Sequence, residues 1–273
     1  MRSTVISTGK SNFALDIKEL WTYRELFYFF SWRDIKVKYK QTVLGLVWVV
    51  LQPLIMMTIF TLFFSRALNV QSSDMPYPVF CFTGLLFWNL FSSGLTSAGN
   101  SMVSNANIIK KIYFPRLIIP VSSIIVSVFD FFITVAIFIG LLLYWKFTPS
   151  LTILYCMPIS LIITLLTTMG VGFLLSALNV KYRDFRYIIP FMVQILMFIT
   201  PVIYPISLIK NELVKNILSL NPIATAIQLA RTGIVGGNVH WPSVLGGIFA
   251  SLFFLIVGLF VFRSVENEFA DIA

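Results

Sequence analysis

Long apolar stretches alternate with short polar segments along most of this chain. Six of these stretches are about as long as the roughly 20 helical residues that cross a hydrocarbon core of about 30 Å. They cover about 44–64, 79–98, 117–145, 151–178, 186–204 and 244–262. Because 58% of the 273 residues are hydrophobic and only 11% are charged, no water-soluble core could bury this much apolar surface. The pattern predicts an all-α integral membrane protein with six transmembrane helices.

The 20 Lys and Arg residues are distributed unevenly among the polar segments. If both termini lie on one side of the membrane, fifteen of these residues fall on that side and five on the other. Such an excess is typical of cytoplasmic segments, so we expect a multi-pass protein with both termini in the cytoplasm. The net charge of +9 then suits anionic lipid headgroups, and we expect no nucleic-acid partner.

The segments outside the six spans have distinct compositions. Residues 1–17 are expected to be a flexible cytoplasmic N-terminus, and residues 264–273 a cytoplasmic C-terminus. Residues 18–40 mix aromatic with basic side chains, which is typical of an amphipathic helix in the headgroup layer. The alternative is a basic flank that only orients the first span. The six-span domain would then cover 41–263.

Two connections between spans carry helix signals. The polar cytoplasmic segment after the second span contains Asn105, and we expect a short helix there that carries Lys110 and Lys111 and docks a soluble partner. The outer connection, about 205–243, is long and unusually apolar. Asn221 followed by Pro222 is typical of a helix start, and the helix of about 222–235 would end at Gly236 and Gly237. We expect a pair of short re-entrant helices in this connection.

No enzyme site or metal site is predicted. Residues 4–11, TVISTGKS, end like a phosphate-binding loop, but Thr4 occupies the position of its first glycine and only three residues precede it. The match is therefore attributed to chance. His240 is the only histidine and no cluster of acids accompanies it. Cys81 and Cys156 both fall within spans and are interpreted as small buried apolar residues.

Polar side chains inside spans are costly, so they are either functional or join helices together. Gln52 in the first span and Gln194 in the fifth are expected at similar depths. Helical spacing surrounds each glutamine with aromatic and apolar side chains. Two such helices could line a path for a sugar chain, since aromatic rings stack on sugar faces and amides bond to hydroxyls. The candidate lining residues are Trp48, Gln52, Met56, Phe60, Phe191, Gln194, Phe198 and Tyr204. The alternative, that these side chains only pack against lipid or other helices, stays open.

Asp130 lies near the middle of the third predicted span. A charged carboxylate at that depth should be paired, hydrated or protonated. Pairing within the fold is the favoured interpretation, and a proton-coupled role is the alternative.

Four segments carry a resemblance to a known family. They are WRDIKVKYKQTVLGLVWVVLQPL (32–54), NANIIKKIYFPRLIIPVSS (105–123), LNVKYRDFRYIIPF (178–191) and ITPVIYPISLI (199–209), followed by Asn-Pro at 221–222. In this order the chain resembles the membrane-spanning subunits of ABC-2 class polysaccharide exporters, the permeases for O-antigen, teichoic acid and capsule. The segments YFPRLIIP and KYRDFRY are the most specific.

The resemblance implies a homodimer that works with two copies of a separate ATPase subunit in the bacterial inner membrane. ATP and Mg would be bound by that partner, and this chain would hold no cofactor. The substrate would be an undecaprenyl-diphosphate-linked glycan, with O-antigen favoured on the form of the YFPRLIIP segment. The interface helix would fall at 18–40 and the coupling helix at about 100–115. The first and fifth spans would line the channel, and Arg33, Lys36 and Lys38 would attract the diphosphate to its entrance.

Two other functional classes are weighed against this interpretation. A membrane-embedded glycosyltransferase or polymerase places acidic and basic side chains together at the membrane surface, whereas the outer loops here carry just Asp74 and Glu212. An ion-coupled secondary transporter predicts an inverted repeat and several charges within spans, and neither is apparent in the sequence.

Thiol labelling tests the predicted topology. Cysteines introduced singly at positions 72 and 238, in a variant without Cys81 and Cys156, should react with an impermeant reagent added outside. A cysteine at position 182 should react only after the membrane is permeabilised. Labelling of position 182 from outside would contradict a topology with both termini in the cytoplasm.

Overall fold

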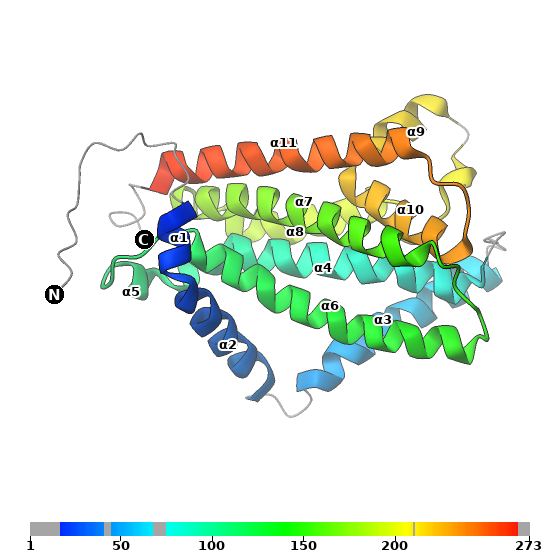
Figure 1. The fold of residues 1–273 in the computed structure, drawn as a ribbon, viewed down its shortest axis with the longest axis horizontal. Helices are drawn as coiled ribbons and strands as arrows, with labels where there is room; N and C mark the ends of the chain where they lie inside the picture. Colours follow the sequence, from blue (N-terminus) through cyan, green and yellow to red (C-terminus); the bar gives the residue numbers. More distant parts are fainter. Residues whose placement is uncertain (1–16, 41–44, 68–74, 210, 267–273) are drawn as a thin grey trace.

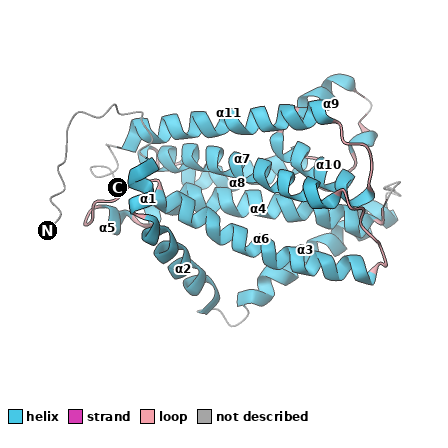
Figure 2. Ribbon diagram, viewed as in Figure 1, coloured by secondary structure: helices cyan, strands magenta, loops and turns pink. Residues whose placement is uncertain are grey.

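Helices form the fold throughout the residues that the computed structural model describes, which are 17–40, 45–67, 75–209 and 211–266 (Figure 1). Figure 2 shows no strand in this part of the chain. The helices are α1 (Ile17–Thr22), α2 (Arg24–Lys40), α3 (Gly45–Phe60), the π-helix η1 (Thr61–Ala67), α4 (Tyr77–Ser104), α5 (Ala106–Ile109), α6 (Ile118–Tyr144), α7 (Ile153–Lys181), α8 (Phe185–Ile199), the 3-10 helix η2 (Ile206–Leu208), α9 (Glu212–Ser219), α10 (Pro222–Val235) and α11 (Trp241–Val265). The expected all-α fold is confirmed for these residues.

Five helices are long and apolar enough to cross a membrane. The first consists of most of α3 and its π-helical continuation, and the others are α4, α6, α7 and α11. Their bounds are Val47–Ser65, Tyr77–Ser104, Ile118–Tyr144, Ile153–Lys181 and Trp241–Val265. Each overlaps a different one of the six predicted spans.

The span predicted at 186–204 is helical only as far as Ile199. The helix there, α8, ends at Ile199, and Thr200 is extended with φ −78° and ψ 133°. Pro201 follows, and proline disfavours the helical conformation of the residue before it. The 15 residues of α8 reach about 22 Å at 1.5 Å per residue, which is short of a hydrocarbon core of about 30 Å. A sixth crossing therefore stays a prediction.

The central helix of the bundle is α4, which packs against α3, α6, α7, α8 and α10. In the most apolar stretch of α4, 78% of the residues are buried. In the corresponding stretch of the first span, which is mostly α3, only 6% are buried. Aromatic side chains fill the space between α4 and α6. The rings of Phe82 and Phe138, for example, stack with centroids 5.9 Å apart. The core thus forms around α4, and α3 lies at the edge of the bundle (Figure 1).

Small residues bring α7 and α11 close together. A Cβ atom at Gly258 would lie 1.9 Å from the carbonyl oxygen of Gly170, so no other residue fits without moving a helix. Glycine at such a crossing lets two helix backbones approach and gain van der Waals contact where water cannot drive association.

The two ends of the bundle differ in their helices. In Figure 1, α1, α5 and the last turns of α11 lie at one end, and α9 and α10 lie toward the other. The hydroxyl of Tyr113, in the segment after α5, lies 3.5 Å from a carboxylate oxygen of Glu19 in α1. The helix predicted at 18–40 is interrupted at Tyr23, which separates α1 from α2. Residues 1–16 of the predicted N-terminus and 267–273 of the predicted C-terminus lie outside the described residues.

The helix predicted at about 222–235 is confirmed as α10, with its expected cap residues. The side-chain oxygen of Asn221 accepts hydrogen bonds from the backbone N–H groups of Ile223 and Ala224. At the other end, Gly236 has φ 86°, a left-handed conformation that glycine adopts without steric cost. A second short helix, α9, precedes it. Their depth in a membrane stays a prediction.

Arg231 of α10 joins the broken end of α8 to α4. Its guanidinium is buried, lies 3.5 Å from the centroid of the Phe80 ring, and donates to the Phe80 carbonyl at 3.1 Å. It also donates to the carbonyls of Pro201, at 2.9 Å, and Val202. Arg231 is one of the five basic residues expected on the outer side, but its side chain satisfies carbonyls that the interrupted helix leaves without a backbone partner.

Replacing Arg231 by methionine should destabilise the protein, because buried carbonyls lose their hydrogen-bond donors. Methionine is chosen because it is a long, unbranched side chain that fills much of the same space. The expected loss is about 2 kcal/mol or more, the scale of leaving buried polar groups unpaired. Lys215→Met is the matched control, since Lys215 forms a surface ion pair with the exposed Glu212. The measurement is the thermal unfolding midpoint in detergent, and equal midpoints for the two variants would contradict the assigned role.

Candidate functional site

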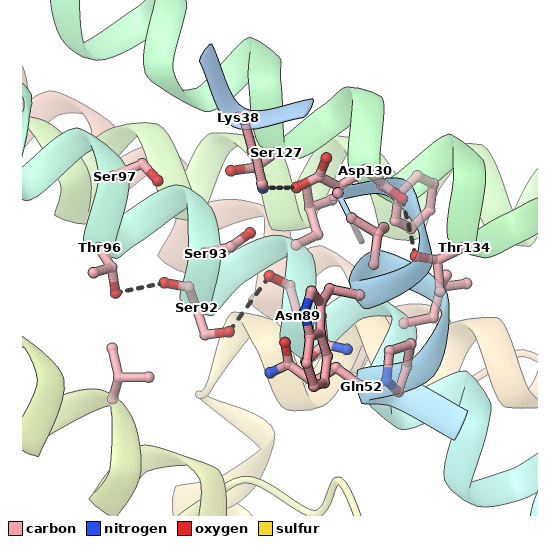
Figure 3. A pocket seen from close by; sticks show the side chains of 18 residues that line it. Lys38, Gln52, Asn89, Ser92, Ser93, Thr96, Ser97, Ser127, Asp130 and Thr134 are labelled. Atoms are coloured by element: carbon pink, nitrogen blue, oxygen red, sulfur yellow. Dashed lines mark hydrogen bonds and ion pairs between the residues drawn. The ribbon is translucent and has the colours of Figure 1, made fainter. Parts of the chain in front are cut away.

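A cavity of about 580 Å³ lies between α3, α4 and α6, near the end of α2 (Figure 3). Five of the polar side chains that line it come from one face of α4. They are Asn89, Ser92, Ser93, Thr96 and Ser97. Their spacing of three and four residues places them on one side of a helix. This polar face lies inside the second predicted span and was not predicted, although its spacing can be read in the sequence.

Two hydroxyl groups of this face donate to carbonyls of their own helix. Thr96 donates to the Ser92 carbonyl at 2.8 Å, and Ser92 donates to the Asn89 carbonyl at 3.4 Å. On α6, Thr134 donates to the Asp130 carbonyl at 2.9 Å. Each hydroxyl oxygen keeps lone pairs that can accept a hydrogen bond. The cavity wall therefore offers acceptors to a ligand rich in hydroxyl groups.

Two of the predicted channel residues, Trp48 and Gln52, line this cavity from α3. They are four residues apart, so they lie on the same face of the helix. Trp48 is 54% exposed, which leaves much of its ring uncovered by this chain. Figure 3 draws Gln52 and Asn89 on the same side of the cavity. An aromatic ring, two amides and several hydroxyls thus meet in one place.

The other predicted channel residues lie elsewhere. Met56 and Phe60 are partly buried against the core around α4. From α8, the cavity is lined by Val193 and not by Gln194. Phe191 and Phe198 are exposed on α8, and Tyr204 donates its hydroxyl to the carbonyls of Phe198 and Ile199 at 3.1 Å. Within one chain the residues predicted on α3 and α8 are not brought into a single cavity.

Asp130 is paired, as the favoured interpretation of its position required. Its carboxylate forms an ion pair with Lys38 and accepts a hydrogen bond from the hydroxyl of Tyr39, both at the end of α2 (Figure 3). Burial, and then the bond to Asp130, raise the pKa of Tyr39, so its hydroxyl keeps the proton that it donates. Lys38 and Asp130 both line the cavity. No basic partner was found among the predicted spans because Lys38 belongs to α2, which lies outside them.

The predicted entrance residues are in part engaged with other side chains. Arg33 donates to Asn105 at 2.8 Å and pairs with Asp34. The ammonium group of Lys36 lies 5.3 Å from the centroid of the Trp32 ring. Arg33 therefore joins the predicted interface helix to Asn105, one of the residues predicted for coupling.

The short helix expected to carry Lys110 and Lys111 is smaller than predicted. It is α5, which ends at Ile109, so both lysines follow it. Four residues form only one turn, and the chain then leaves the helix before Pro115. Both lysines are exposed, as are Ile112 and Tyr113, which are 63% and 74% exposed. These four residues form a basic and apolar surface, called here the 110–113 surface.

Metal chemistry finds no support in the described part of the chain, where no group of three His, Cys, Asp or Glu side chains could hold an ion. Residues 4–11, with their partial phosphate-loop pattern, lie outside the described residues. Cys81 and Cys156 are free and buried, as expected.

The chain is similar in sequence to known membrane transport proteins. The sequence pattern of the ABC-2 type transporter family matches residues 25–235. An O-antigen export system permease protein RfbA of Klebsiella pneumoniae is 31% identical over 240 residues, which cover 88% of this chain and 92% of that protein. The protein of the same name from Myxococcus xanthus is 27% identical over 93% of this chain and 98% of its own length. The polysialic acid transport protein KpsM of Escherichia coli is 23% identical over 86% of this chain and 91% of that protein.

The family match covers more than half of the chain, and these relatives are named as permease or transport proteins and not as enzymes. The five apolar helices long enough to cross a membrane fit the same class. This chain therefore belongs to the ABC-2 type transporter family as a multi-pass membrane permease.

Proposed function

We propose that this chain is the membrane subunit of an ATP-driven exporter of a lipid-linked polysaccharide. Two copies would form the transmembrane channel in the bacterial inner membrane, with both termini in the cytoplasm. Two copies of a separate subunit would bind ATP and Mg. The glycan would be attached to undecaprenyl diphosphate, and the names of the Klebsiella and Myxococcus relatives favour O-antigen.

The observation that carries the proposal is the position and chemistry of α3. This helix has few fully buried residues and presents Trp48 and Gln52 beside the hydroxyl-lined wall of α4. An exposed ring binds a sugar face weakly, and amides and hydroxyls exchange hydrogen bonds with the sugar hydroxyls. Weak and replaceable contacts of this kind suit a polymer that must slide and not stay bound.

A second copy of the chain would complete the path. Phe191 and Phe198 of α8 are mostly exposed and are not covered within one chain. In a homodimer, α3 and α8 of both copies would face a shared channel and supply Gln52 and Gln194 twice. The large uncovered apolar area of these helices supports an interface with protein or lipid.

The 110–113 surface would dock the ATPase subunit. Its two lysines can meet acidic side chains of a partner, and Ile112 and Tyr113 supply apolar area for burial. The hydrogen bond from Arg33 to Asn105, just before α5, then offers a route from the dock to α2. ATP-driven motion at the dock could thereby act on the interface helix.

Charge reversal tests the docking role. Lys110→Glu combined with Lys111→Glu should weaken co-purification of the ATPase about tenfold or more, because attraction to acidic partner residues becomes repulsion. The membrane subunit should still insert normally. Lys146→Glu with Lys215→Glu, at exposed or half-exposed sites away from α5, is the matched control. An intact complex with full ATPase activity in the first variant would remove these lysines from the dock.

The channel assignment is tested by export in cells. Gln52→Leu combined with Gln194→Leu should lower the amount of surface glycan severalfold, since the path loses its exchanging hydrogen bonds. Phe198→Ala should act in the same direction. Expression and ATPase assembly should stay normal. Phe253→Ala is the control, because Phe253 is a similarly exposed ring on α11. Normal surface glycan in the double glutamine variant would identify these amides as packing contacts.

A further inference from the structure

A second cavity lies where the end of α7 meets the start of α8 and the junction between α4 and α5. Its volume is about 430 Å³, within the usual range of ligand pockets. Val103 and Val180 form part of its apolar wall, and the polar wall consists of Asn179, Arg183, Arg186 and Tyr187. It lies at the end of the bundle that carries α5, which is the predicted cytoplasmic end.

The two arginines are free to bind a ligand. Among the residues that the structure describes, neither guanidinium has a hydrogen-bond or ion-pair partner. Asp184 lies between them in sequence but does not line the cavity. Asn179 holds the wall in place, since it donates to the Gly99 carbonyl at 2.8 Å and to the Asn100 side chain at 3.1 Å.

This arrangement contrasts with two of the basic residues of α2, Arg33 and Lys38. Arg33 is hydrogen-bonded to Asn105 and paired with Asp34, and Lys38 is paired with Asp130. A carboxylate already offsets each of these two charges. Arg183 and Arg186 therefore supply uncompensated positive charge beside a cavity, on the same end of the bundle.

Two guanidinium groups at one cavity suit phosphate chemistry. Each presents a planar fork of N–H donors that matches two oxygens of a phosphate group, and such charge-assisted bonds are about twice as strong as neutral ones. The hydroxyl of Tyr187 adds a further donor. The apolar walls would suit the lipid or sugar attached to a phosphate. They would offer few favourable contacts to a protein surface rich in carboxylates.

One residue that lines the cavity lies on the same face of α8 as the predicted path. Tyr187 lines the cavity, and Phe191, Gln194 and Phe198 follow it at spacings of four, three and four residues. Residues at these spacings share one face of a helix. A headgroup held by the arginines would thus place the attached chain at the start of the exposed face of α8.

We propose that Arg183 and Arg186 form a binding site for the diphosphate of the lipid-linked glycan, at the cytoplasmic start of the α8 path. The proposal rests on the proposed function, which supplies that substrate. It assigns the headgroup to the junction of α7 and α8, with Arg183 between the helices and Arg186 in the first turn of α8, whereas the sequence pointed to the basic residues of α2. Phosphodiester headgroups of ordinary phospholipids share part of this chemistry, and acidic residues of the ATPase are a separate alternative.

The test uses the complete permease–ATPase complex in nanodiscs of zwitterionic lipid, with labelled undecaprenyl diphosphate as the probe. Arg183→Gln combined with Arg186→Gln should weaken its binding at least tenfold. Lys181→Gln is the control, because it removes a charge from the same junction but does not line the cavity. Unlabelled undecaprenyl monophosphate and phosphatidylglycerol are added as competitors, and each should displace the probe less well than undecaprenyl diphosphate.

Three results would overturn the site. The first is unchanged binding of the probe to the double arginine variant. The second is competition by phosphatidylglycerol as effective as that by undecaprenyl diphosphate, which would identify a general headgroup site. The third is loss of the ATPase from the double variant with lipid binding intact, which would identify a protein contact.

Export in cells separates failure of this site from failure of the proposed function. If cells that lack this chain keep their surface polysaccharide, the proposed function fails, whatever the arginines do. If those cells lose the polysaccharide and the double arginine variant restores it fully, with unchanged probe binding, only the site assignment fails.

Discussion

A carboxylate halfway along an apolar helix is costly to bury, and this cost determines how the N-terminal helices join the bundle. Asp130 lies near the middle of α6. From the end of α2, Lys38 neutralises its charge and Tyr39 donates a hydrogen bond to it. Because α3 begins at Gly45, soon after the end of α2, this contact also restricts where α3 can start. This ion pair therefore helps to position α3 at the polar cavity that it shares with α4 and α6.

The same constraint acts at the two ends of the bundle. Where Pro201 interrupts α8, Arg231 supplies the donors that the free carbonyls need. At the other end, Arg33 joins α2 to Asn105 beside α5. These polar contacts attach the peripheral segments to the core around α4, while α3 stays largely uncovered. A displacement at α5 would act on α2 through Arg33, and through α2 on the start of α3.

The apolar helices and their local caps could be predicted from sequence. Contacts between side chains that lie far apart in the sequence could not. Five spans and the capped helix α10 follow from apolar length and from Asn221, Pro222 and Gly236, which act locally. The end of α8 was missed because an apolar run continues past Pro201. The partner of Asp130 lies 92 residues away in sequence, so no local pattern could identify it. Trp48 and Gln52 were found because they are adjacent on one helix face, whereas assembly of α3 with α8 requires a second chain.

Photo-crosslinking at Trp48 tests the central claim, that the glycan passes α3, most directly. A photoreactive phenylalanine analogue replaces Trp48 in one variant and Phe253 of α11 in another, in cells that contain the ATPase and synthesise labelled glycan. The account predicts a glycan adduct at position 48 that requires an active ATPase, and none at position 253. No adduct at position 48 during active export, or equal adducts at both positions, would contradict it.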